Sequence, residues 1–349
     1  MSVIIPCYNA ARFVHEAVNS VFTQTYTDYE VVVVNDGSPD TTELEQALAP
    51  WLDRIVYVKT NNYGPGGARN NGIRASRGEL IALLDSDDVW EPNYLEVQAS
   101  HLDQDPHADI VYPNALSFGD GPLSGTDCWY SRGQVTFTSL VRGQRDINSG
   151  RKLESGTDDK CVVFYSVLAR RAALERVGWF ADDCSYVGVE DLDLWLRCVK
   201  NGCCITYHNQ VLVRYRRRDG SLSSDPVWML GQITRVLSKA RSTLFLTDEE
   251  RHLLDSVLLH FEGNKAFQEG KRAFIAGDTP LAIELLQKAN TYLNSTRLGM
   301  MILLIGTTPR LARYAYAWRR LFVGSRPAAC LARRNIDRNS SLPNVHRLD

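Results

Sequence analysis

The sequence predicts an α/β domain built on a mainly parallel sheet, followed by a helical C-terminal region. In the first half, short β-branched runs alternate with helix-like segments, and repeated βα units place their strands in parallel. Residues 30–34 form a continuous hydrophobic run, as expected of a strand that is buried on both faces. Beyond Pro226 the pattern becomes almost entirely helical, which marks a second structural region.

The individual elements follow from the period of the apolar residues along the chain. We expect strands at residues 3–5, 30–34, 55–58 and 80–84, and helices at residues 11–23, 41–52, 68–75 and 191–200. Two further helices between residues 260 and 290 meet near Gly277 and Pro280, which favour a helix end and a helix start. This pair resembles a tetratricopeptide-type hairpin, and a single hairpin favours a packing subdomain over a peptide-binding module.

Composition indicates a soluble globular protein and argues against some partners. Hydrophobic residues make up 44% and charged residues 23% of the 349 residues, as in ordinary folded domains. The net charge of -2 is not that of a nucleic-acid-binding protein. None of the eight cysteines forms a Cys-x-x-Cys pair, so we expect reduced, mostly buried thiols. The strand-like run from Ser2 leaves no room for a signal peptide, and residues 299–306 fall short of the roughly 20 that a membrane span needs.

Positive charge is concentrated in the last part of the chain. Residues 297–349 hold ten Arg and two Asp, with aromatic residues between the arginines at 311–322. This composition suits an anionic membrane surface, so we expect a cytoplasmic protein that contacts the membrane peripherally through this tail. A helix packed on the α/β domain with solvated arginines is the alternative. The predicted organisation is an α/β domain at 1–225, a helical region at 226–296 and a basic tail at 297–349.

Polar clusters follow three of the predicted strands where each one ends. They occupy residues 6–9, 35–38 and 85–88. Open parallel sheets bind ligands beyond the carboxyl ends of their strands. The three clusters are therefore expected to meet in one crevice.

The acidic cluster at residues 85–88 predicts a divalent cation site. Its three carboxylates repel one another in a water-poor crevice unless a cation neutralises them. Mg²⁺ or Mn²⁺ suits this role, because hard cations take oxygen ligands and keep positions open for a diphosphate. A solvated turn that caps the next helix is the alternative. In the second cluster, Asp36 can accept a hydrogen bond from a nucleobase or ribose, or bond to its own backbone.

Two other segments carry side chains that could bind a ligand or take part in catalysis. Residues 64–70 are predicted to form a glycine-rich loop shaped for the close approach of a ligand, with Arg69 serving a diphosphate or base, or lying at the surface. Glu190 and Asp191 open a predicted helix. Acids in that position stabilise the helix dipole, or act as a general base for a hydroxyl group when they are held rigidly.

Five motifs occur in an order that is typical of one enzyme family. They are residues 3–9 (VIIPCYN), 34–38 (VNDGS), 67–73 (GARNNGI), 84–88 (LDSDD) and 189–195 (VEDLDLW). Together they resemble a family 2 glycosyltransferase of the GT-A fold, over about residues 2–224. Each motif alone is weak, and their common order makes the resemblance specific.

The resemblance implies a role for each side chain at the strand ends. Such an enzyme moves a sugar from a nucleotide-sugar donor, usually UDP-linked, to an acceptor hydroxyl and inverts the anomeric centre. The resemblance implies that the nucleoside is held by Pro6, Tyr8, Asp36 and Arg69. It implies that Asp87 and Asp85 bind the Mn²⁺ or Mg²⁺ ion, with Asp85 also near the ribose. It implies that Glu190 places the acceptor and that Asp191 is the catalytic base. The metal would stabilise the departing nucleotide diphosphate.

Two features depart from the family pattern. Family members often carry a Tyr-Arg-x-His-x-x-Ser segment, whereas residues 215–221 place Arg218 at the histidine position. Arginine does not ligate a metal, so we expect Arg218 to bind the donor diphosphate directly. The Gln-x-x-Arg-Trp motif of processive synthases is absent from the sequence, which implies the transfer of one sugar per encounter. The implied acceptor is a glycan or lipid-linked molecule of cell-envelope polysaccharide or glycolipid assembly.

Two other functions remain as alternatives on the sequence alone. A sugar nucleotidyltransferase shares similar sheets and acidic metal sites, but a glycine-rich loop with a basic residue normally follows its first strand. A catalytically inactive, membrane-associated adaptor would act through the helical region. The presence of both Asp87 and Asp191 counts against the adaptor.

Overall fold

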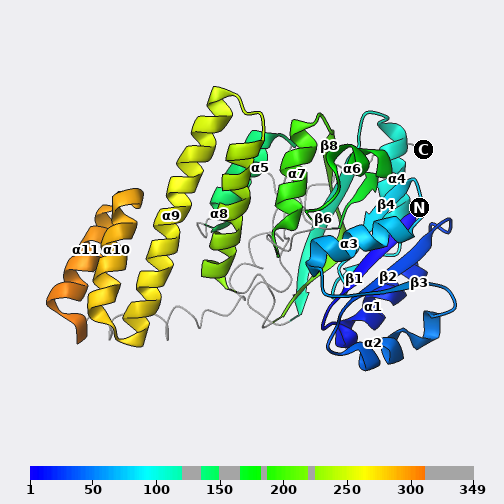
Figure 1. Cartoon of the computed structure of the whole chain (residues 1–349), viewed down its shortest axis with the longest axis horizontal. Helices are drawn as coiled ribbons and strands as arrows, with labels where there is room; N and C mark the ends of the chain where they lie inside the picture. The colour runs from blue at the N-terminus through cyan, green and yellow to red at the C-terminus, as the bar shows by residue number, and fades with distance from the viewer. Residues whose placement is uncertain (120–134, 149–165, 182–186, 219–224, 311–349) are drawn as a thin grey trace, which may run out of the picture. The chain divides into compact units, whose positions relative to one another are not determined.

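The computed structural model describes residues 1–119, 135–148, 166–181, 187–218 and 225–310 (Figure 1). The chain divides into two compact units, residues 1–268 and 269–349. Most of the predicted basic tail, from position 311 onward, lies outside the described residues.

The described part of the first unit contains an eight-stranded sheet with the strand order β3-β2-β1-β4-β7-β6-β8-β5. Its strands are β1 (Ser2–Cys7), β2 (Glu30–Asp36), β3 (Val56–Thr60), β4 (Leu80–Leu83), β5 (Val89–Trp90), β6 (Ile110–Gly119), β7 (Leu168–Arg170) and β8 (Ile205–Arg217). The pairs β3–β2, β2–β1, β1–β4 and β6–β8 are parallel. The three pairs that involve β7 or β5 are antiparallel. The predicted mainly parallel α/β sheet is confirmed.

Helices pack on the sheet, and the described chain from Pro226 onward is almost entirely helical, as predicted (Figure 1). The helices of the α/β part are α1 (Ala11–Phe22), α2 (Thr41–Leu48), the short 3₁₀-helix η1 (Ala49–Trp51), α3 (Gly64–Ala75), α4 (Tyr94–Gln104), α5 (Phe137–Asn148), α6 (Arg171–Val177) and α7 (Glu190–Lys200). They are followed by α8 (Pro226–Thr243), α9 (Asp248–Ala276), α10 (Thr279–Leu293) and α11 (Thr296–Thr307).

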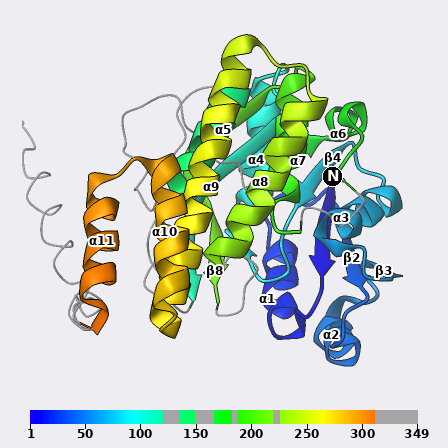
Figure 2. The same cartoon turned by 60° about the vertical axis from the view of Figure 1, so that its left-hand side comes forward.

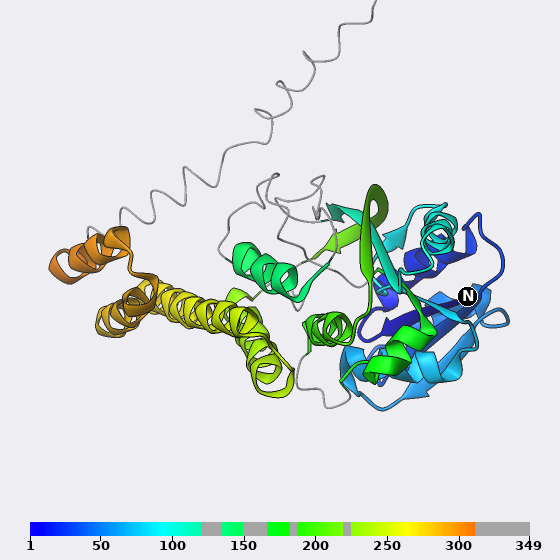
Figure 3. The same ribbon diagram turned by 90° about the horizontal axis from the view of Figure 1, so that it is seen from above.

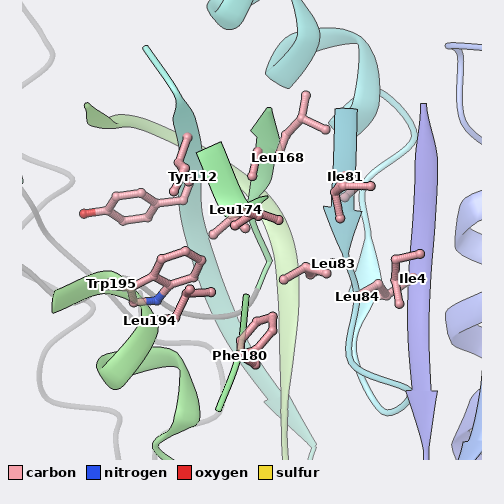
Figure 4. Close-up of a cluster of buried hydrophobic side chains, with 14 of the residues drawn as sticks. Ile4, Ile81, Leu83, Leu84, Tyr112, Leu168, Leu174, Phe180, Leu194 and Trp195 are labelled. Carbon is pink, nitrogen blue, oxygen red and sulfur yellow. The ribbon is translucent and has the colours of Figure 1, made fainter. Parts of the chain in front are cut away.

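The core of the first unit joins the centre of the sheet to α7. Figure 4 shows Ile81 and Leu83 of β4, Leu168 of β7, and Leu194 and Trp195 of α7 in one cluster of buried side chains. Side chains of this size give up their contact with water favourably, and close packing then leaves little freedom to move. The packing therefore fixes α7, and with it the acidic residues at the start of this helix.

Helix α3 begins at Gly64, four residues before its predicted start at residue 68, so the loop predicted for residues 64–67 is wrong. Pro65 lies in the first turn, where its missing N–H costs no helical hydrogen bond. A β-carbon at Gly72, later in the same helix, would lie 2.4 Å from Cγ2 of Ile4 and 3.1 Å from Cγ2 of Val34. Glycine in α3 therefore serves the close approach of the helix to β1 and β2, a tertiary constraint that outweighs its low helix propensity.

The second unit contains the end of α9 together with α10 and α11. Figures 1, 2 and 3 show α10 and α11 side by side. Gly277, with φ of +95°, ends α9, and a β-carbon at Gly270 would lie 2.8 Å from Cγ of Leu286 in α10. In the structure α9 ends at Ala276 and α10 begins at Thr279, on either side of Gly277. No helix in the described ranges is long and apolar enough to cross a membrane.

Candidate active site

The polar clusters after β1, β2 and β4 lie next to one another at the carboxyl ends of these strands. Parallel pairing of β1 with β2 places Cys7 opposite Asn35. Beyond the strands, the backbone N–H of Asn9 donates to Oγ of Ser38 at 2.7 Å, and a hydrogen bond joins the side chains of Cys7 and Ser86. The three clusters therefore form one polar edge, as expected of a parallel sheet.

Asp36 ends β2 and is almost fully buried, at 2% exposure. Its Oδ1 atom accepts hydrogen bonds from Oγ1 of Thr60 and from the backbone N–H of Tyr63, both at 3.0 Å. Burial raises the pKa of the Asp36 carboxyl, and these two bonds oppose the rise. Tyr8 is 51% exposed and Pro6 is partly exposed. A buried acceptor and an exposed aromatic ring at one edge suit a flat ligand with hydrogen-bond donors.

A cavity of about 750 Å³ lies between β3 and α3, next to this carboxylate. Its walls include Lys59 and Thr60 of β3, Tyr63, and Arg74 of α3. Thr60 and Tyr63 also bind Asp36, so the cavity adjoins the buried carboxylate. The sequence did not indicate this cavity, because its walls come from segments that meet only in the fold.

Two arginines at the end of β8 bind the acidic cluster that follows β4. Asp88 is buried, and its Oδ1 atom accepts from the backbone N–H of Arg216 at 2.8 Å. Nε of Arg218 donates to Oδ2 of Asp87 at 2.9 Å, and the Asp87 side chain keeps 22% exposure. Burial, followed by the negative charge of Asp85, raises the pKa of the Asp87 carboxyl. Asp88 therefore anchors β8, whereas Asp87 remains accessible to a ligand.

Arg69 joins two acidic groups that are far apart in the sequence. The residue is 2% exposed, and its Nη2 atom donates to Oδ1 of Asp85 at 2.5 Å while Nη1 donates to Oε1 of Glu190 at 2.6 Å. Glu190 is also buried and accepts from the backbone N–H of Gly188 at 2.7 Å. Because a buried charge is costly without a partner, this bridge holds both carboxylates in fixed positions.

Asn70 fixes the segment that follows α6 against α3. Its Nδ2 atom donates to the carbonyl oxygen of Phe180 at 2.9 Å, and its Oδ1 atom accepts from the Phe180 backbone N–H at 3.1 Å. The guanidinium of Arg69 lies 5.5 Å from the centre of the Phe180 ring. Sequence reasoning missed the roles of Asn70 and Phe180. A signal for Asn70 was present, because it follows Arg69 directly within one of the five motifs.

Asp191 is the second residue of α7 and is partly exposed. Its Oδ1 atom accepts from the backbone N–H of Leu192 at 2.7 Å. Burial, followed by the negative charge of Glu190, raises the pKa of the Asp191 carboxyl to about 8, and the positive charge of Arg69 opposes the rise. A carboxylate with a pKa near neutral pH is a stronger proton acceptor than an ordinary one, so Asp191 is suited to act as a general base.

The acidic cluster also fits a divalent cation in its chemistry. Within the described ranges, no group of three or more His, Cys, Asp or Glu side chains surrounds a metal position. Asp85 and Asp87 still supply the carboxylate oxygens that hard cations prefer. A cation there would relieve the repulsion that raises the pKa of Asp87. The residues therefore fit an ion that takes its remaining ligands from a diphosphate or from water.

A mainly parallel sheet with carboxylates and arginines at its strand ends is the arrangement of α/β proteins that bind nucleotides at this edge. The profile of one family, described as Glycosyl transferase family 2, matches residues 2–178 of the 349-residue chain. The match covers half of the chain. The protein therefore belongs to glycosyltransferase family 2, as the five motifs implied.

Relatives of known sequence agree with this assignment. An uncharacterized glycosyltransferase of Rickettsia prowazekii is 30% identical over 216 residues, which are 62% of this chain and 63% of that protein. Another from Rickettsia conorii is 40% identical over 111 residues, which are 32% of this chain and 18% of the relative. The chain thus spans less than two thirds of the length of these two relatives.

Solved structures share the fold at low sequence identity. S. aureus TarS in complex with UDP-GlcNAc matches with a TM-score of 0.56 and 20% identity, over 90% of this chain and 87% of that chain. The mannosyltransferase PcManGT from Pyrobaculum calidifontis, in complex with GDP-Man and Mn²⁺, matches with a TM-score of 0.52 and 18% identity, over 92% and 87% of the two chains. At these identities the likeness concerns the fold alone, and it confirms the GT-A fold.

Proposed function

We propose that this protein transfers one sugar from a nucleoside diphosphate sugar to a hydroxyl group of an acceptor. The observation that carries the proposal is the bridge made by Arg69. This bridge holds Asp85, predicted to lie at the donor, and Glu190, predicted to lie at the acceptor, within one site. Membership of glycosyltransferase family 2 supports the reaction class.

The proposed donor is a UDP-linked hexose or N-acetylhexosamine. Asp36 would accept a hydrogen bond from the imide N–H of uracil, while Tyr8 and Pro6 would contact the face of the base. Arg69, which is 2% exposed and binds Asp85, is proposed to act on the donor through Asp85. Two structural neighbours were solved with UDP-GlcNAc and with GDP-Man, so the base is the first property of the donor to test.

Asp87, assisted by Asp85, is proposed to hold Mn²⁺ or Mg²⁺ together with the donor diphosphate. When bound, the ion would stabilise the negative charge on the departing diphosphate. Arg218 already binds Asp87, and a guanidinium carries further N–H donors that suit phosphate oxygens. Arg218 would therefore take the place that histidine has in other family members and bind the diphosphate rather than the metal.

Transfer is proposed to occur by a single displacement that inverts the anomeric centre. Asp191 removes the proton from the acceptor hydroxyl while the hydroxyl oxygen forms a bond to the anomeric carbon. The bond between that carbon and the diphosphate oxygen breaks in the same step, and the nucleoside diphosphate leaves. Glu190, held by Arg69, orients the acceptor hydroxyl toward Asp191.

The proposed acceptor is a glycan or a lipid-linked molecule in polysaccharide or glycolipid assembly, and one sugar is added per encounter. The α/β domain at residues 1–225 would carry the reaction, and the helical region at 226–296 would serve packing. A peripheral position on the cytoplasmic face of a membrane would suit a lipid-linked acceptor. The aromatic and arginine-rich residues 311–322, on which that position was predicted, lie outside the described residues.

Donor binding tests this proposal most directly. Purified full-length protein is titrated by calorimetry with a panel of UDP-, GDP- and dTDP-linked sugars in Mn²⁺, Mg²⁺ or chelator, and slow donor hydrolysis is followed in parallel. We expect one UDP-linked sugar to bind in a metal-dependent way. Asp87→Asn should weaken that binding by about tenfold or more, because it removes a charged metal ligand.

A matched variant controls for the general effect of removing a negative charge. Asp53 is exposed and lies outside the polar edge, so Asp53→Asn should bind the donor as the wild type does. Equal weakening in both variants would indicate a long-range charge effect and contradict a metal site at Asp87. If none of the nucleotide sugars binds under any metal condition, the transferase proposal fails.

A further inference from the structure

Helix α11 presents apolar side chains to solvent along its outer face. Leu298 and Ile305 are buried on the inner side of the helix. The outer side carries Met300 at 64%, Met301 at 39%, Leu303 at 68% and Leu304 at 42% exposure. We call these four residues the α11 apolar face. Surface helices of soluble proteins normally show polar residues on the side away from the core, so this face departs from the usual pattern.

The sequence on either side of α11 is complementary in charge to an anionic surface. Arg297 is the only charged residue within α11. The sequence from position 285 to position 336 contains no Asp or Glu, eight Arg and one Lys. Basic residues next to an apolar helix face bring it toward negatively charged lipid headgroups, and the apolar side chains then enter the boundary with the acyl chains.

The dimensions of α11 exclude a spanning position for this helix. Its 12 residues give a length of about 18 Å, against a hydrocarbon core of about 30 Å. An apolar stripe of this length instead suits a helix that lies in the plane of the membrane surface.

We propose that α11 is a lipid-binding element that docks on an anionic membrane surface through Met300, Met301, Leu303 and Leu304. The occupant of this face is the headgroup and upper acyl region of a bilayer that contains acidic phospholipid. This inference deepens the peripheral membrane position proposed above and rests on it, with the side chains of α11 and the charge of the neighbouring sequence as its evidence. Its failure would remove that position and leave the proposed sugar transfer untouched.

Vesicle flotation of the full-length protein tests the proposal. The protein is mixed with vesicles of phosphatidylcholine alone, or of equal parts phosphatidylcholine and phosphatidylglycerol, and separated on a density gradient. We expect flotation with the acidic vesicles that weakens at high salt, because salt screens the arginine charges. The variant Leu303→Gln/Leu304→Gln should reduce partitioning into acidic vesicles by about tenfold, because it removes apolar side chains from the face.

A matched variant separates the α11 apolar face from exposed apolar residues in general. Leu52 and Phe245 are exposed at positions in the first unit, so Leu52→Gln/Phe245→Gln removes a similar number of apolar side chains elsewhere. This control should float as the wild type does. Circular dichroism and thermal unfolding check that both variants fold, and Met300→Gln/Met301→Gln offers a second pair on the same face.

Three results would overturn the proposal. The wild type could stay out of the acidic vesicles, or the α11 variants could float as well as the wild type. The wild type could also form an oligomer in light scattering that Leu303→Gln/Leu304→Gln dissociates, without flotation of either protein. That last result would assign the face to a second copy of the chain. Donor hydrolysis, measured on the same samples, reports on the transferase site independently.

Discussion

Two groups of carboxylates face the same edge of the sheet, and the protein neutralises them in different ways. The acidic cluster after β4 lies in a turn and receives Arg216 and Arg218 from the end of β8. The acidic pair Glu190–Asp191 lies at the start of a rigid helix, and Arg69 binds only the first of the two residues directly. In the structure Asp85 and Asp87 of the first group are each 22% exposed and each binds an arginine, whereas Asp191 of the second group lies next to Glu190, with its pKa raised to about 8.

We infer from this difference that the first group binds charged ligands and that Asp191 transfers a proton. A carboxylate that is surrounded by arginines is ready to exchange partners with a cation or a phosphate group. A carboxylate that is close to another acid and partly removed from water holds its proton more tightly, as the raised pKa of Asp191 shows. The two groups are coupled because Arg69 binds Asp85 in one and Glu190 in the other.

We expect the largest effect on kcat when the proposed proton acceptor, Asp191, is replaced. Asp191→Asn should lower kcat by about 10³-fold, because an amide cannot accept the proton of the acceptor hydroxyl. Donor affinity should change little, since the donor is proposed to bind at the other group. Steady-state kinetics with the identified donor, together with donor calorimetry, measure both quantities. Wild-type kcat in this variant would remove Asp191 from the mechanism.

Asp193 provides the control for that variant on the same helix. Its carboxylate is buried and binds Arg197 at 2.8 Å and Lys239 at 3.0 Å. Asp193→Asn should therefore lower the free energy of unfolding by about 1–3 kcal/mol, the usual cost of disturbing a buried charged hydrogen bond. It should leave the kcat of the folded protein close to that of the wild type. The opposite pattern in the two variants would separate catalytic from structural carboxylates on α7.

A smaller effect, on the free energy of unfolding, is expected when Arg69, which binds both acidic groups, is replaced. Arg69→Met should lower the free energy of unfolding by about 3 kcal/mol, because it leaves Asp85 and Glu190 without their shared buried cation. Chemical denaturation measures this loss. Arg74→Met, five residues further along α3, is the control, because Arg74 lies in the cavity wall and donates to Oδ1 of Asn71 at 3.0 Å. Equal losses in the two variants would contradict a special role for the bridge.

The smallest expected effect is the dependence of kcat/KM on pH. A general base must be deprotonated, so kcat/KM should rise about tenfold per pH unit below the pKa of Asp191, about 8, and level off above it. A bound divalent cation would lower this midpoint by its opposite charge. A midpoint near the ordinary carboxyl value of about 4 would contradict the environment described for Asp191.

The raised pKa of Asp191 also predicts how the free energy of unfolding depends on pH. This free energy should fall as the pH rises, whereas kcat/KM should increase. The folded pKa of Asp191 is raised from 3.8 to about 8, so the contribution of this group is fully present below pH 3.8 and is lost as the pH rises toward 8. Asp191→Asn has no carboxyl group to ionise at this position, so it does not lose this stability as the pH rises. The variant should therefore be more stable than the wild type at pH 9, and the gain should shrink as the pH falls. Denaturation at several pH values measures it.

Much of the fold could be predicted because it depends on short-range patterns. The strands β1, β2, β3 and β4 and the intervening helices follow the period of apolar residues, which local sequence carries directly. The glycine-rich start of α3 was predicted wrongly for the converse reason. In the fold Gly66 lies against Phe180, Ala181 and Glu190 from distant segments, a tertiary contact that the low helix propensity of glycine does not reveal.

In the candidate site, too, residues in local motifs could be predicted, whereas contacts between distant segments could not. Asp36, Asp87 and Asp191 could be singled out because each follows a strand or opens a helix at a recognisable motif. The Arg69 bridge, by contrast, could not be predicted from spacing, because its partners Asp85 and Glu190 meet only when α3, β4 and α7 pack together. The roles of these residues in catalysis stay predictions until the variants are measured.

By itself the sequence determined the first four strands and the helices between them, the family and the residues available at the carboxyl edge. Hydrophobic period and residue type, which set these features, are local properties of the chain. Only the tertiary structure decided which carboxylate is paired, which stays accessible and which holds its proton. Those properties depend on burial and on charges brought together from distant segments, and no local pattern records either of them.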